Sequence, residues 1–423
     1  MRLPIFHTVS CILVLLFSAL PAHTQTAHLV ADINPNGDSS PRFFTVYKSK
    51  LYFSASDGIL GNGELWVYDG INPPTIAADI NPLFDSMPNY LTVFNSKLYF
   101  SANDGSNGEE LWAYDGINPP TMVADIYPTG SSKPHELTVF KSKLYFSATN
   151  GTSGIELWVY DGSGVPTIVA DINNTGSSYP SDLTSLNNNK LCFAATNGVN
   201  GKELWTYDGL GSLNMVDNIH PTGDSKPEHL AVFNSKLYFS ANDGTDGEEL
   251  WVYNGAGLVE MVADINPLGH SSPRYLTVFD SRLYFSVYNG TELFEPWVYD
   301  GTNTPTKLAD INPDPGAGSY PVFFTVHNSK LFFAAQNETN NMELWAYDGT
   351  NLPTMVADID PVGESFPKHL TSFNSRLYFS ADDGTNGIEL WAYGDEGEDD
   401  GDGKDESVFF WPFFLPAIIG DRF

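Results

Sequence analysis

The sequence predicts an all-β protein that folds as an eight-bladed β-propeller, with four-stranded blades of about 46 residues. Three observations support this: a tryptophan at fixed spacing, strand-like segments repeated in one order, and two chain ends that complement each other. The tryptophans are Trp66, Trp112, Trp158, Trp205, Trp251, Trp297, Trp345 and Trp391. Their separations are 46, 46, 47, 46, 46, 48 and 46 residues. A repeat of this length is typical of a propeller blade.

Each repeat contains four short segments that favour β-strands. In the second repeat they are LTVF (91–94), KLYFSA (97–102), ELWAY (110–114) and TMVADI (121–126). Apolar, β-branched and aromatic runs of this length, bounded by Gly, Pro, Asn and Asp, are typical of strands. We number the strands of a blade from first to fourth, outwards from the centre, because the long connection after the fourth segment suits a crossing to the next blade.

The two ends of the repeat region predict how the ring closes. The chain starts its repeats with an isolated fourth strand, HLVADI (28–33). It finishes with HLTSF, RLYFSA and IELWAY (369–393), which are first, second and third strands without a fourth. We therefore expect the N-terminal strand to complete the last blade, which removes an open sheet edge.

The repeated motif resembles a known family. ELWVYDG (64–70) and ELWAYDGT (343–350) are similar to the motif of the bacterial ELWxxDGT-repeat proteins. The likeness covers residues 28–393, with departures at FEPW (294–297) and ELWAYGD (389–395). The resemblance implies an exported or surface-associated bacterial β-propeller, and it implies no defined activity.

Composition changes divide the chain into four regions. Residues 1–24 have a short basic start, an apolar run and a small-residue exit, which is the pattern of a secretory signal peptide. Residues 25–393 form the predicted propeller, and residues 394–407 form an acidic, Gly-rich linker predicted to be disordered. We therefore expect an exported protein, either extracellular or at the cell surface, with the periplasm as an alternative.

The last region, residues 408–423, is a hydrophobic tail. It is too short and too interrupted by proline for a membrane-spanning helix. An apolar tail behind a flexible linker indicates a partner, and we expect it to engage a sorting machinery, a membrane or a partner protein. The alternative is a segment that folds back on the propeller.

Charge and cysteine content exclude some functions. The net charge is −32, which argues against a nucleic-acid partner, because nucleic-acid binding needs basic patches. Removal of the signal peptide would leave Cys192 as the single cysteine, so we predict no intramolecular disulfide.

One face of the propeller should be acidic. The second-to-third loops and the crossing loops share one face, which we call the upper face. It should carry a repeated glutamate before each Leu-Trp and a repeated Asp or Asn at the end of each fourth strand. We expect the latter to cap backbone N–H groups of the crossing loop.

The second-to-third loops read D/N-G-x-x-G-x-E in most blades, and such oxygen ligands could hold Ca²⁺. The residues of this calcium hypothesis are Asp57, Glu64, Asp104, Glu110, Asp243, Glu249, Asp383 and Glu389. The alternative is that Asp/Asn-Gly serves only the turn.

Residues that recur in every blade favour a scaffold role, and residues that differ between blades favour function. The repeated tryptophans should therefore belong to the core. Blades six and seven depart most on the upper face, with YNGTELFEP (288–296) and QNETNNM (336–342). We predict a partner contact there from Phe294, Glu295, Glu338 and Asn340.

The sequence leaves three functions open. The first is a non-enzymatic propeller for binding or adhesion, with an extracellular protein or glycan as ligand and calcium as its only suggested cofactor. The second is a secreted enzyme that acts on polysaccharide through carboxylates of the upper face. The third is a structural component of the cell surface or matrix.

Overall fold

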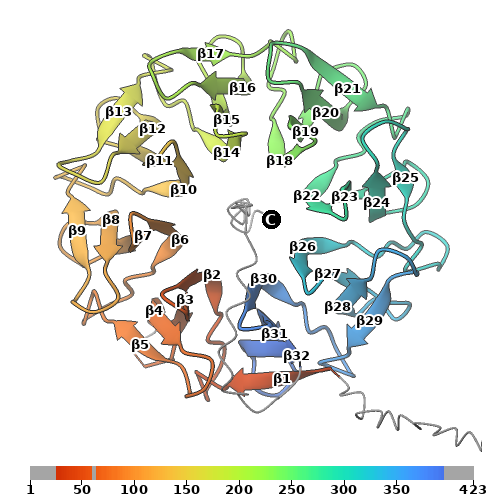
Figure 1. Cartoon of the computed structure of the whole chain (residues 1–423), viewed down its shortest axis with the longest axis horizontal. Coiled ribbons are helices and arrows are strands. Elements are labelled where there is room, and N and C mark those ends of the chain that lie inside the picture. Colours follow the sequence, from red (N-terminus) through yellow and green to blue (C-terminus); the bar gives the residue numbers. More distant parts are fainter. Residues whose placement is uncertain (1–24, 60–62, 395–423) are drawn as a thin grey trace, which may run out of the picture.

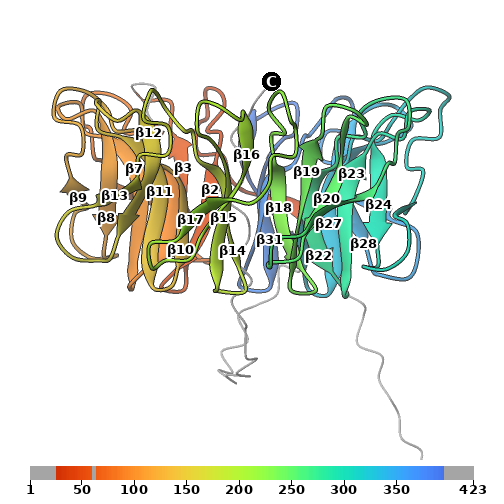
Figure 2. The same ribbon diagram turned by 90° about the horizontal axis from the view of Figure 1, so that it is seen from above.

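The computed structural model describes residues 25–59 and 63–394, which form eight four-stranded antiparallel sheets around a central axis (Figure 1). This confirms the predicted eight-bladed β-propeller. Within these residues every regular element is a strand. Seen from the side, the loops gather on two opposite faces of a short cylinder (Figure 2). The predicted signal peptide, nearly all of the linker and the tail lie outside the described residues.

The innermost strands surround the axis. They are β2 (Arg42–Tyr47), β6 (Asn89–Phe94), β10 (His135–Phe140), β14 (Ser181–Leu186), β18 (Glu228–Phe233), β22 (Arg274–Phe279), β26 (Val322–His327) and β30 (Lys368–Phe373). The second strands are β3 (Lys50–Ser56), β7 (Lys97–Asn103), β11 (Lys143–Thr149), β15 (Lys190–Thr196), β19 (Lys236–Asn242), β23 (Arg282–Val287), β27 (Lys330–Gln336) and β31 (Arg376–Asp382).

The third and outermost strands complete each blade. The third strands are β4 (Gly63–Tyr68), β8 (Glu109–Tyr114), β12 (Ile155–Tyr160), β16 (Lys202–Tyr207), β20 (Glu248–Tyr253), β24 (Glu295–Tyr299), β28 (Met342–Tyr347) and β32 (Ile388–Gly394). The outermost strands are β5 (Thr75–Ala78), β9 (Thr121–Ala124), β13 (Thr167–Ala170), β17 (Leu213–Met215), β21 (Val259–Ala263), β25 (Thr306–Lys307), β29 (Thr354–Ala357) and β1 (Thr26–Ala31).

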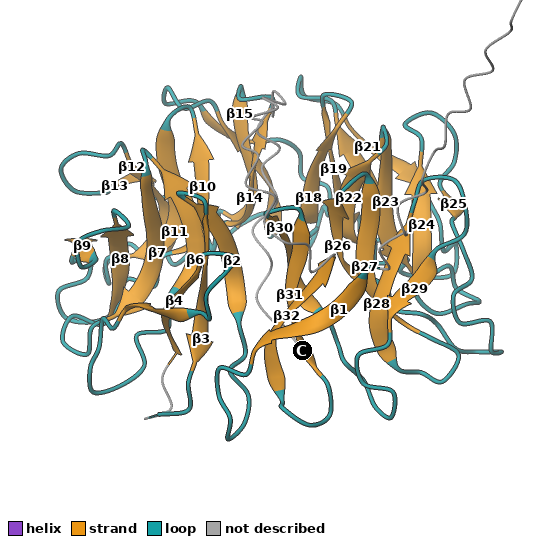
Figure 3. Cartoon of the chain, turned by 60° about the horizontal axis from the view of Figure 1, so that its bottom comes forward, coloured by secondary structure: helices purple, strands orange, loops and turns teal. Residues whose placement is uncertain are grey.

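The N-terminal strand completes the last blade, as predicted. The order of this sheet is β1-β32-β31-β30, and β1 runs antiparallel to β32 with Leu29 opposite Trp391. Figure 3 shows β1 lying along β32 at the outside of the ring. Val30 and Ala31 also pack against the core between the last and first blades. The ring therefore has no unpaired strand edge at its junction.

The core lies between neighbouring blades. Leu98, Phe100 and Ala102 on one side of β7 pack with Tyr52 and Leu65 of the preceding blade. Equivalent clusters fill the other interfaces, which explains why the second strands are apolar on both sides.

The repeated tryptophans and the single described cysteine belong to this scaffold. Trp158 packs in an inter-blade cluster, and its indole N–H donates to the carbonyl of Ala148 at 2.9 Å. Trp66 and Trp391 are likewise at most 8% exposed. Cys192 is buried, and this burial raises the pKa of its thiol to about 12.

Threonines join the innermost strands of successive blades. The hydroxyl of Thr45 donates to the carbonyl of Leu91 in the next blade at 2.9 Å, and Thr92 donates to Leu137 at 3.1 Å. The same bond recurs at Thr138, Thr277 and Thr325. These bonds tie the blades together at the axis.

We expect deletion of residues 25–31 to destabilise the ring and make the protein self-associate. The deletion removes the partner strand of β32 and exposes its hydrogen-bonding edge to other molecules. Thermal unfolding and light scattering would measure the two effects, with a chain lacking only residues 1–24 as the control. An unchanged unfolding midpoint and a monomeric deletion variant would contradict the role assigned to β1.

Candidate functional site

A buried glutamate stands at or near the start of the third strand in every blade. These residues are Glu64, Glu110, Glu156, Glu203, Glu249, Glu295, Glu343 and Glu389, and none is more than 5% exposed. All eight carboxylates accept hydrogen bonds from the crossing loop on the upper face.

In the third blade, one carboxylate oxygen of Glu156 accepts the backbone N–H of Ser178 at 2.8 Å. The other oxygen accepts the hydroxyl of Ser178 at 2.6 Å and the N–H of Ile172 at 2.9 Å. We call this three-bond arrangement the glutamate clasp. The serines are Ser39, Ser86, Ser132, Ser178, Ser225, Ser271, Ser319 and Ser365. The isoleucines are Ile33, Ile80, Ile126, Ile172, Ile219, Ile265, Ile311 and Ile359.

The clasp corrects one expectation from the sequence. The sequence predicts that the residues at the ends of the fourth strands cap the crossing loop, but the clasp glutamates accept those N–H groups instead. Asp32 and Asp79 are exposed beside the loop. A buried carboxylate is tolerable only where its oxygens are hydrogen-bonded, and the loop amides and serine hydroxyl meet that requirement.

Burial nevertheless raises the pKa of the clasp carboxyls. In Glu249 and Glu295, loss of hydration raises the pKa to about 7. The hydrogen bonds from Ser271 and Ser319 act in the opposite direction, because they stabilise the ionised form. The other six clasp glutamates also have a raised pKa for the same reason.

The clasp involves all four glutamates of the calcium hypothesis. The sequence predicts that these glutamates are exposed to solvent on the upper face, and this prediction is wrong. All four are buried and hydrogen-bonded to their serine and isoleucine partners: Glu64, Glu110, Glu249 and Glu389.

The four aspartates of that hypothesis stabilise their own loops. Asp104 accepts the N–H groups of Ser106 and Asn107, at 2.9 and 2.8 Å. Asp243 and Asp383 make the same bonds two and three residues ahead. Asp57 accepts the N–H of Ile59 at 2.9 Å, just before undescribed residues 60–62.

Within residues 25–59 and 63–394, no group of three or more His, Cys, Asp or Glu side chains is placed to hold a metal ion. Each aspartate accepts hydrogen bonds from its own turn, while the glutamate of the same blade accepts hydrogen bonds from the crossing loop. Calcium binding stays a prediction, which thermal unfolding with calcium and then with EDTA would test.

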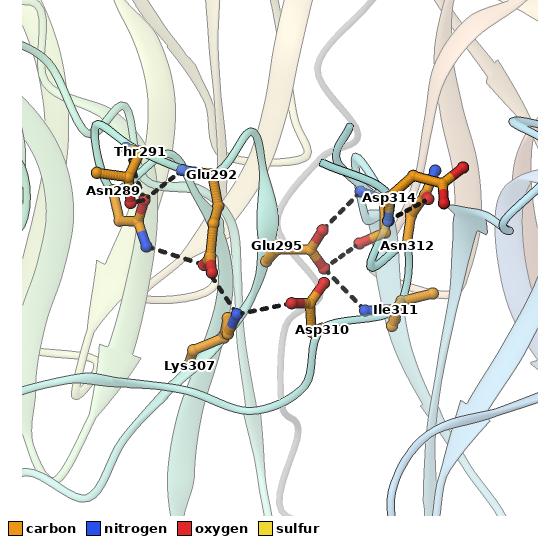
Figure 4. A network of polar contacts seen from close by, with 10 residues as sticks. Asn289, Thr291, Glu292, Glu295, Lys307, Asp310, Ile311, Asn312 and Asp314 are labelled. Atoms are coloured by element: carbon orange, nitrogen blue, oxygen red, sulfur yellow. Dashed lines mark hydrogen bonds and ion pairs between the residues drawn. The ribbon is translucent and has the colours of Figure 1, made fainter. Parts of the chain in front are cut away.

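The four residues of the predicted partner contact do not form one surface. Glu295 is buried in its clasp, and Figure 4 shows it bonded to Ile311. Glu338 and Asn340 are exposed in the loop after β27, where the side-chain amide of Asn312 donates to Asn340 at 3.1 Å. Phe294 packs among other aromatic side chains.

The sixth blade has an ion-paired network outside its clasp (Figure 4). The ammonium of Lys307 lies 2.8 Å from Glu292 and 3.2 Å from Asp310. Asn289 also donates to Glu292 at 3.1 Å. These contacts fix the unusual loop of this blade, so part of its departure from the repeat is structural.

Phe294 belongs to a half-buried aromatic group. Its ring centroid is 6.2 Å from Tyr288 and 5.9 Å from Tyr320. The guanidinium of Arg274, which is exposed, lies over the ring at 5.0 Å. This part of the predicted contact is accessible.

The second residue of each innermost strand has a backbone conformation unusual for non-glycine residues. These residues are Phe43, Tyr90, Glu136, Asp182, His229, Tyr275, Phe323 and His369, with φ between 56° and 59°. The strand pairing shifts register at this point in each blade. We call these eight residues the collar, because they follow one another around the axis on the innermost strands.

Collar side chains contact one another from blade to blade. The Phe43 and Tyr90 rings are 5.2 Å apart, and the Tyr275 and Phe323 rings are 5.4 Å apart. Since every blade has the same collar backbone, that conformation is architectural. The collar side chains differ between blades, so they are candidates for a function such as ligand binding.

Two neighbouring collar positions are acidic. A carboxylate oxygen of Glu136 accepts the N–H of Asp182 at 3.0 Å, and Asp182 accepts the N–H of His229 at 2.9 Å. Burial, followed by the nearby charge of Asp182, raises the pKa of Glu136 to about 8. Burial and the charge of Glu228 raise the pKa of Asp182 to about 6, while Lys202 opposes both shifts. The structure thus contains a carboxyl pair restricted to two blades.

Three other positions in each blade adjoin the collar, and we call all four together the channel mouth. One is the residue before the collar: Arg42, Asn89, His135, Ser181, Glu228, Arg274, Val322 and Lys368. The next is the middle residue of Ser-x-Pro: Ser40, Met87, Lys133, Tyr179, Lys226, Ser272, Tyr320 and Phe366. The last precedes the clasp glutamate: Gly63, Glu109, Ile155, Lys202, Glu248, Phe294, Met342 and Ile388.

Contacts between these positions show that they are neighbours. The ammonium of Lys202 donates to the hydroxyl of Ser181 at 2.8 Å. Ser272 of blade six donates to Glu248 of blade five at 3.2 Å. The Arg274–Phe294 contact joins the first and last of these positions in blade six.

Nearly all the basic residues of the upper face are at the channel mouth. The described residues contain 17 Lys and Arg side chains, since Arg2, Lys404 and Arg422 lie outside them. Ten of the 17 open the second strands or lie in the turns just before them, and Lys307 is on β25. The other six are at the mouth: Arg42, Lys133, Lys202, Lys226, Arg274 and Lys368.

The mouth has two chemically different halves. Its five acids, Glu109, Glu136, Asp182, Glu228 and Glu248, all belong to blades two to five. Blades six, seven, eight and one contribute no acid to the mouth; instead they contribute Arg42, Arg274 and Lys368, six Phe and Tyr side chains, and His369. We call the part from these four blades the aromatic half.

Sequence reasoning identified Phe294 but not the rest of the mouth. The signal was present, because residues beside the invariant Ser-x-Pro and Glu-x-Trp motifs vary between blades while the motifs themselves do not. Only the tertiary structure shows that these variable residues converge on the axis. The clasp was similarly visible as a glutamate and a serine that recur together in every blade.

No helix in the described part of the chain is long and apolar enough to cross a membrane. Neither a protein-family model nor a curated protein matches the sequence. Among solved structures, prolyl endopeptidases match 83% of this chain with 10% identity and a TM-score of 0.52. A puromycin-hydrolyzing peptidase from Mycobacterium tuberculosis matches 86% with 12% identity and a TM-score of 0.50. Oligopeptidase B from Trypanosoma brucei matches 81% with 12% identity and a TM-score of 0.50.

This chain spans only 55%, 61% and 53% of those three proteins, respectively. At such low identity the similarity shows the β-propeller fold alone.

We expect Ser39→Ala to lower the free energy of unfolding by about 1.5–3 kcal/mol, the usual range for a hydrogen bond to a charged group. Ser39 donates to Glu389 at 2.6 Å and so joins the N-terminal segment to the last blade. Ser40→Ala is the matched control, because Ser40 is the next residue, is exposed, and its side chain takes no part in the clasp. Chemical denaturation of both variants would test this; equal stabilities would contradict the clasp.

We also expect thermal stability to increase as the pH falls from 8 to 5. The clasp glutamates have a raised pKa in the folded state, to about 7 for Glu249 and Glu295. The folded protein therefore holds these protons more tightly than the unfolded chain does. The resulting contribution to the free energy of unfolding is fully present below the unfolded-state pKa and is lost as the pH rises through the folded-state pKa. At much lower pH the trend should reverse, because turn hydrogen bonds lower the pKa of Asp69 and Asp115 to about 2.

Unfolding midpoints at constant ionic strength would test this dependence. Glu249→Gln should show a smaller pH-dependent change than the wild type, because the buried group no longer titrates. A midpoint that falls steadily from pH 8 to pH 5 would contradict the prediction.

Proposed function

We propose that this protein is an exported, non-enzymatic binding or adhesion propeller of the ELWxxDGT-repeat type, which takes its ligand at the channel mouth. One observation carries the proposal: the innermost positions of the upper face vary from blade to blade, whereas the motifs that build each blade are repeated. A ligand that occupies one place needs such local differences.

The chemistry of the repeated residues supports the same view. The clasp commits all eight repeated glutamates to the crossing loops, and the loop aspartates that begin D-G motifs cap their own turns. The repeated carboxylates of the upper face therefore serve the scaffold. The mouth, in contrast, offers accessible aromatic and basic groups such as Phe294 and Arg274.

A screen against arrays of extracellular glycans and peptides would test this proposal. We expect the full chain to bind at least one class of ligand, and the double variant Arg274→Gln/Phe294→Ala to lose that binding. Lys97→Gln, on the opposite face, should bind normally. Loss of binding in the Lys97 variant, or retention in the double variant, would place the ligand elsewhere.

A second function, a secreted enzyme acting on polysaccharide, is favoured by the Glu136–Asp182 pair. Burial raises the pKa of both neighbouring carboxyls, and such raised values suit general acid–base chemistry near neutral pH. Incubating polysaccharides with the protein and measuring new chain ends would detect this activity. Cleavage that disappears in Glu136→Gln would establish the enzyme and overturn the non-enzymatic proposal.

A further inference from the structure

The aromatic half of the mouth combines two features that single out one kind of ligand. Within this half, each basic side chain lies over an aromatic ring. The distances to the ring centroids are 5.9 Å for Arg42 over Phe43, 5.0 Å for Arg274 over Phe294 and 4.4 Å for Lys368 over Phe366. Such contacts hold the charged groups beside apolar surfaces.

The electrostatic environment distinguishes this half from the rest of the protein. The chain has 52 acids and 20 Lys and Arg residues, yet the aromatic half contains three basic side chains and no acid. Arg274 and Lys368 form no ion pair with any carboxylate in the described chain. Because this half contributes no carboxylate of its own to the mouth, Arg274 and Lys368 are placed to receive an anion from outside.

The aromatic surface restricts the class of anion that this half of the mouth could bind. Phe294 is flanked by Tyr288 and Tyr320, and all three rings are half-buried, so each keeps some accessible surface. The C–H faces of a sugar ring are apolar and can stack on such surfaces, while a guanidinium forms paired hydrogen bonds with a carboxylate.

We propose that the aromatic half of the channel mouth binds a carboxylated polysaccharide, with sugar rings against Phe294 and its neighbouring tyrosines and carboxylates on Arg274 and Lys368. This inference rests on the proposed binding function and specifies its ligand class. The half of the mouth on blades two to five mixes five acids with Lys133, Lys202 and Lys226, so it lacks an acid-free basic surface and the chain should bind on one side of the axis.

Calorimetric titration of the full chain with three probes would test the proposal: hexasaccharides of galacturonate, mannuronate and hyaluronan. We expect at least one to bind, and added salt to weaken binding. The methyl ester of a bound uronate, or for hyaluronan its carboxyl-reduced form, is the matched neutral control. This control should bind roughly tenfold more weakly or worse, because a charge-assisted hydrogen bond is lost at each carboxylate.

Variants separate charge from stacking. Arg274→Gln and Lys368→Gln should each weaken binding roughly tenfold, and Phe294→Leu should weaken it while leaving the salt dependence unchanged. Lys97→Gln is the matched control for loss of one positive charge on the opposite face. Arg274 is exposed, so its substitution should leave the unfolding midpoint unchanged, and that measurement verifies the fold.

The outcomes distinguish this inference from the proposed function. Failure of all three oligosaccharides, or equal binding of the neutral control, overturns the carboxylated polysaccharide. If a hexaglutamate peptide binds instead and Arg274→Gln abolishes that binding, the mouth remains the binding site but its ligand is an acidic peptide. If ligands found in the array screen are unaffected by every mouth variant, both proposals fail.

Discussion

The glutamate clasp is the interaction on which the upper face of this propeller depends. A propeller blade must send its chain from the outermost strand back to the axis, and this crossing loop has backbone N–H groups that lie outside the regular strand pairing of the blade. One buried carboxylate per blade accepts two of them and a serine hydroxyl, as Glu156 does with Ile172 and Ser178. The crossing loop is thereby fixed to the third strand of the blade it leaves. At the junction of the ring the same contact joins Glu389 to Ser39, so one local rule also assists the closure.

The clasp stabilises the loops at an electrostatic cost. Eight carboxyls are removed from water in a chain of net charge −32, and burial raises the pKa of each of them. The hydrogen bonds recover part of this penalty, because an ionised acceptor forms stronger bonds than a neutral one. The stability of the upper face therefore depends on the protonation state of the buried clasp glutamates.

Fixed crossing loops leave the residues next to them free to vary. The Ser-x-Pro serine and the clasp glutamate are invariant among the blades, whereas the residues beside them range from Lys202 and Lys133 to Phe294 and Phe366. These variable positions are the ones that surround the axis. The repeated motifs thus build the same frame in every blade. The variable residues beside them can differ from blade to blade and so determine the charge and polarity of the mouth. In this chain the result is one half with all the acids and another with aromatic rings beneath basic groups.

The sequence alone determined the number of blades, their strand order and the closure by the N-terminal strand, because spacing and hydrophobic pattern are local properties. It also indicated that Trp158 and its equivalents belong to the scaffold. It placed the repeated glutamates on an exposed acidic face, and there it was wrong, since Glu110 and Ser132 are 22 residues apart and meet only when the crossing loop folds back over the third strand. The collar was equally out of reach: Glu136 and Asp182 come from different blades and become neighbours only because the innermost strands converge on one axis. Tertiary structure decided which carboxylates are buried and which side chains share the mouth, because both depend on contacts between segments that no local pattern connects.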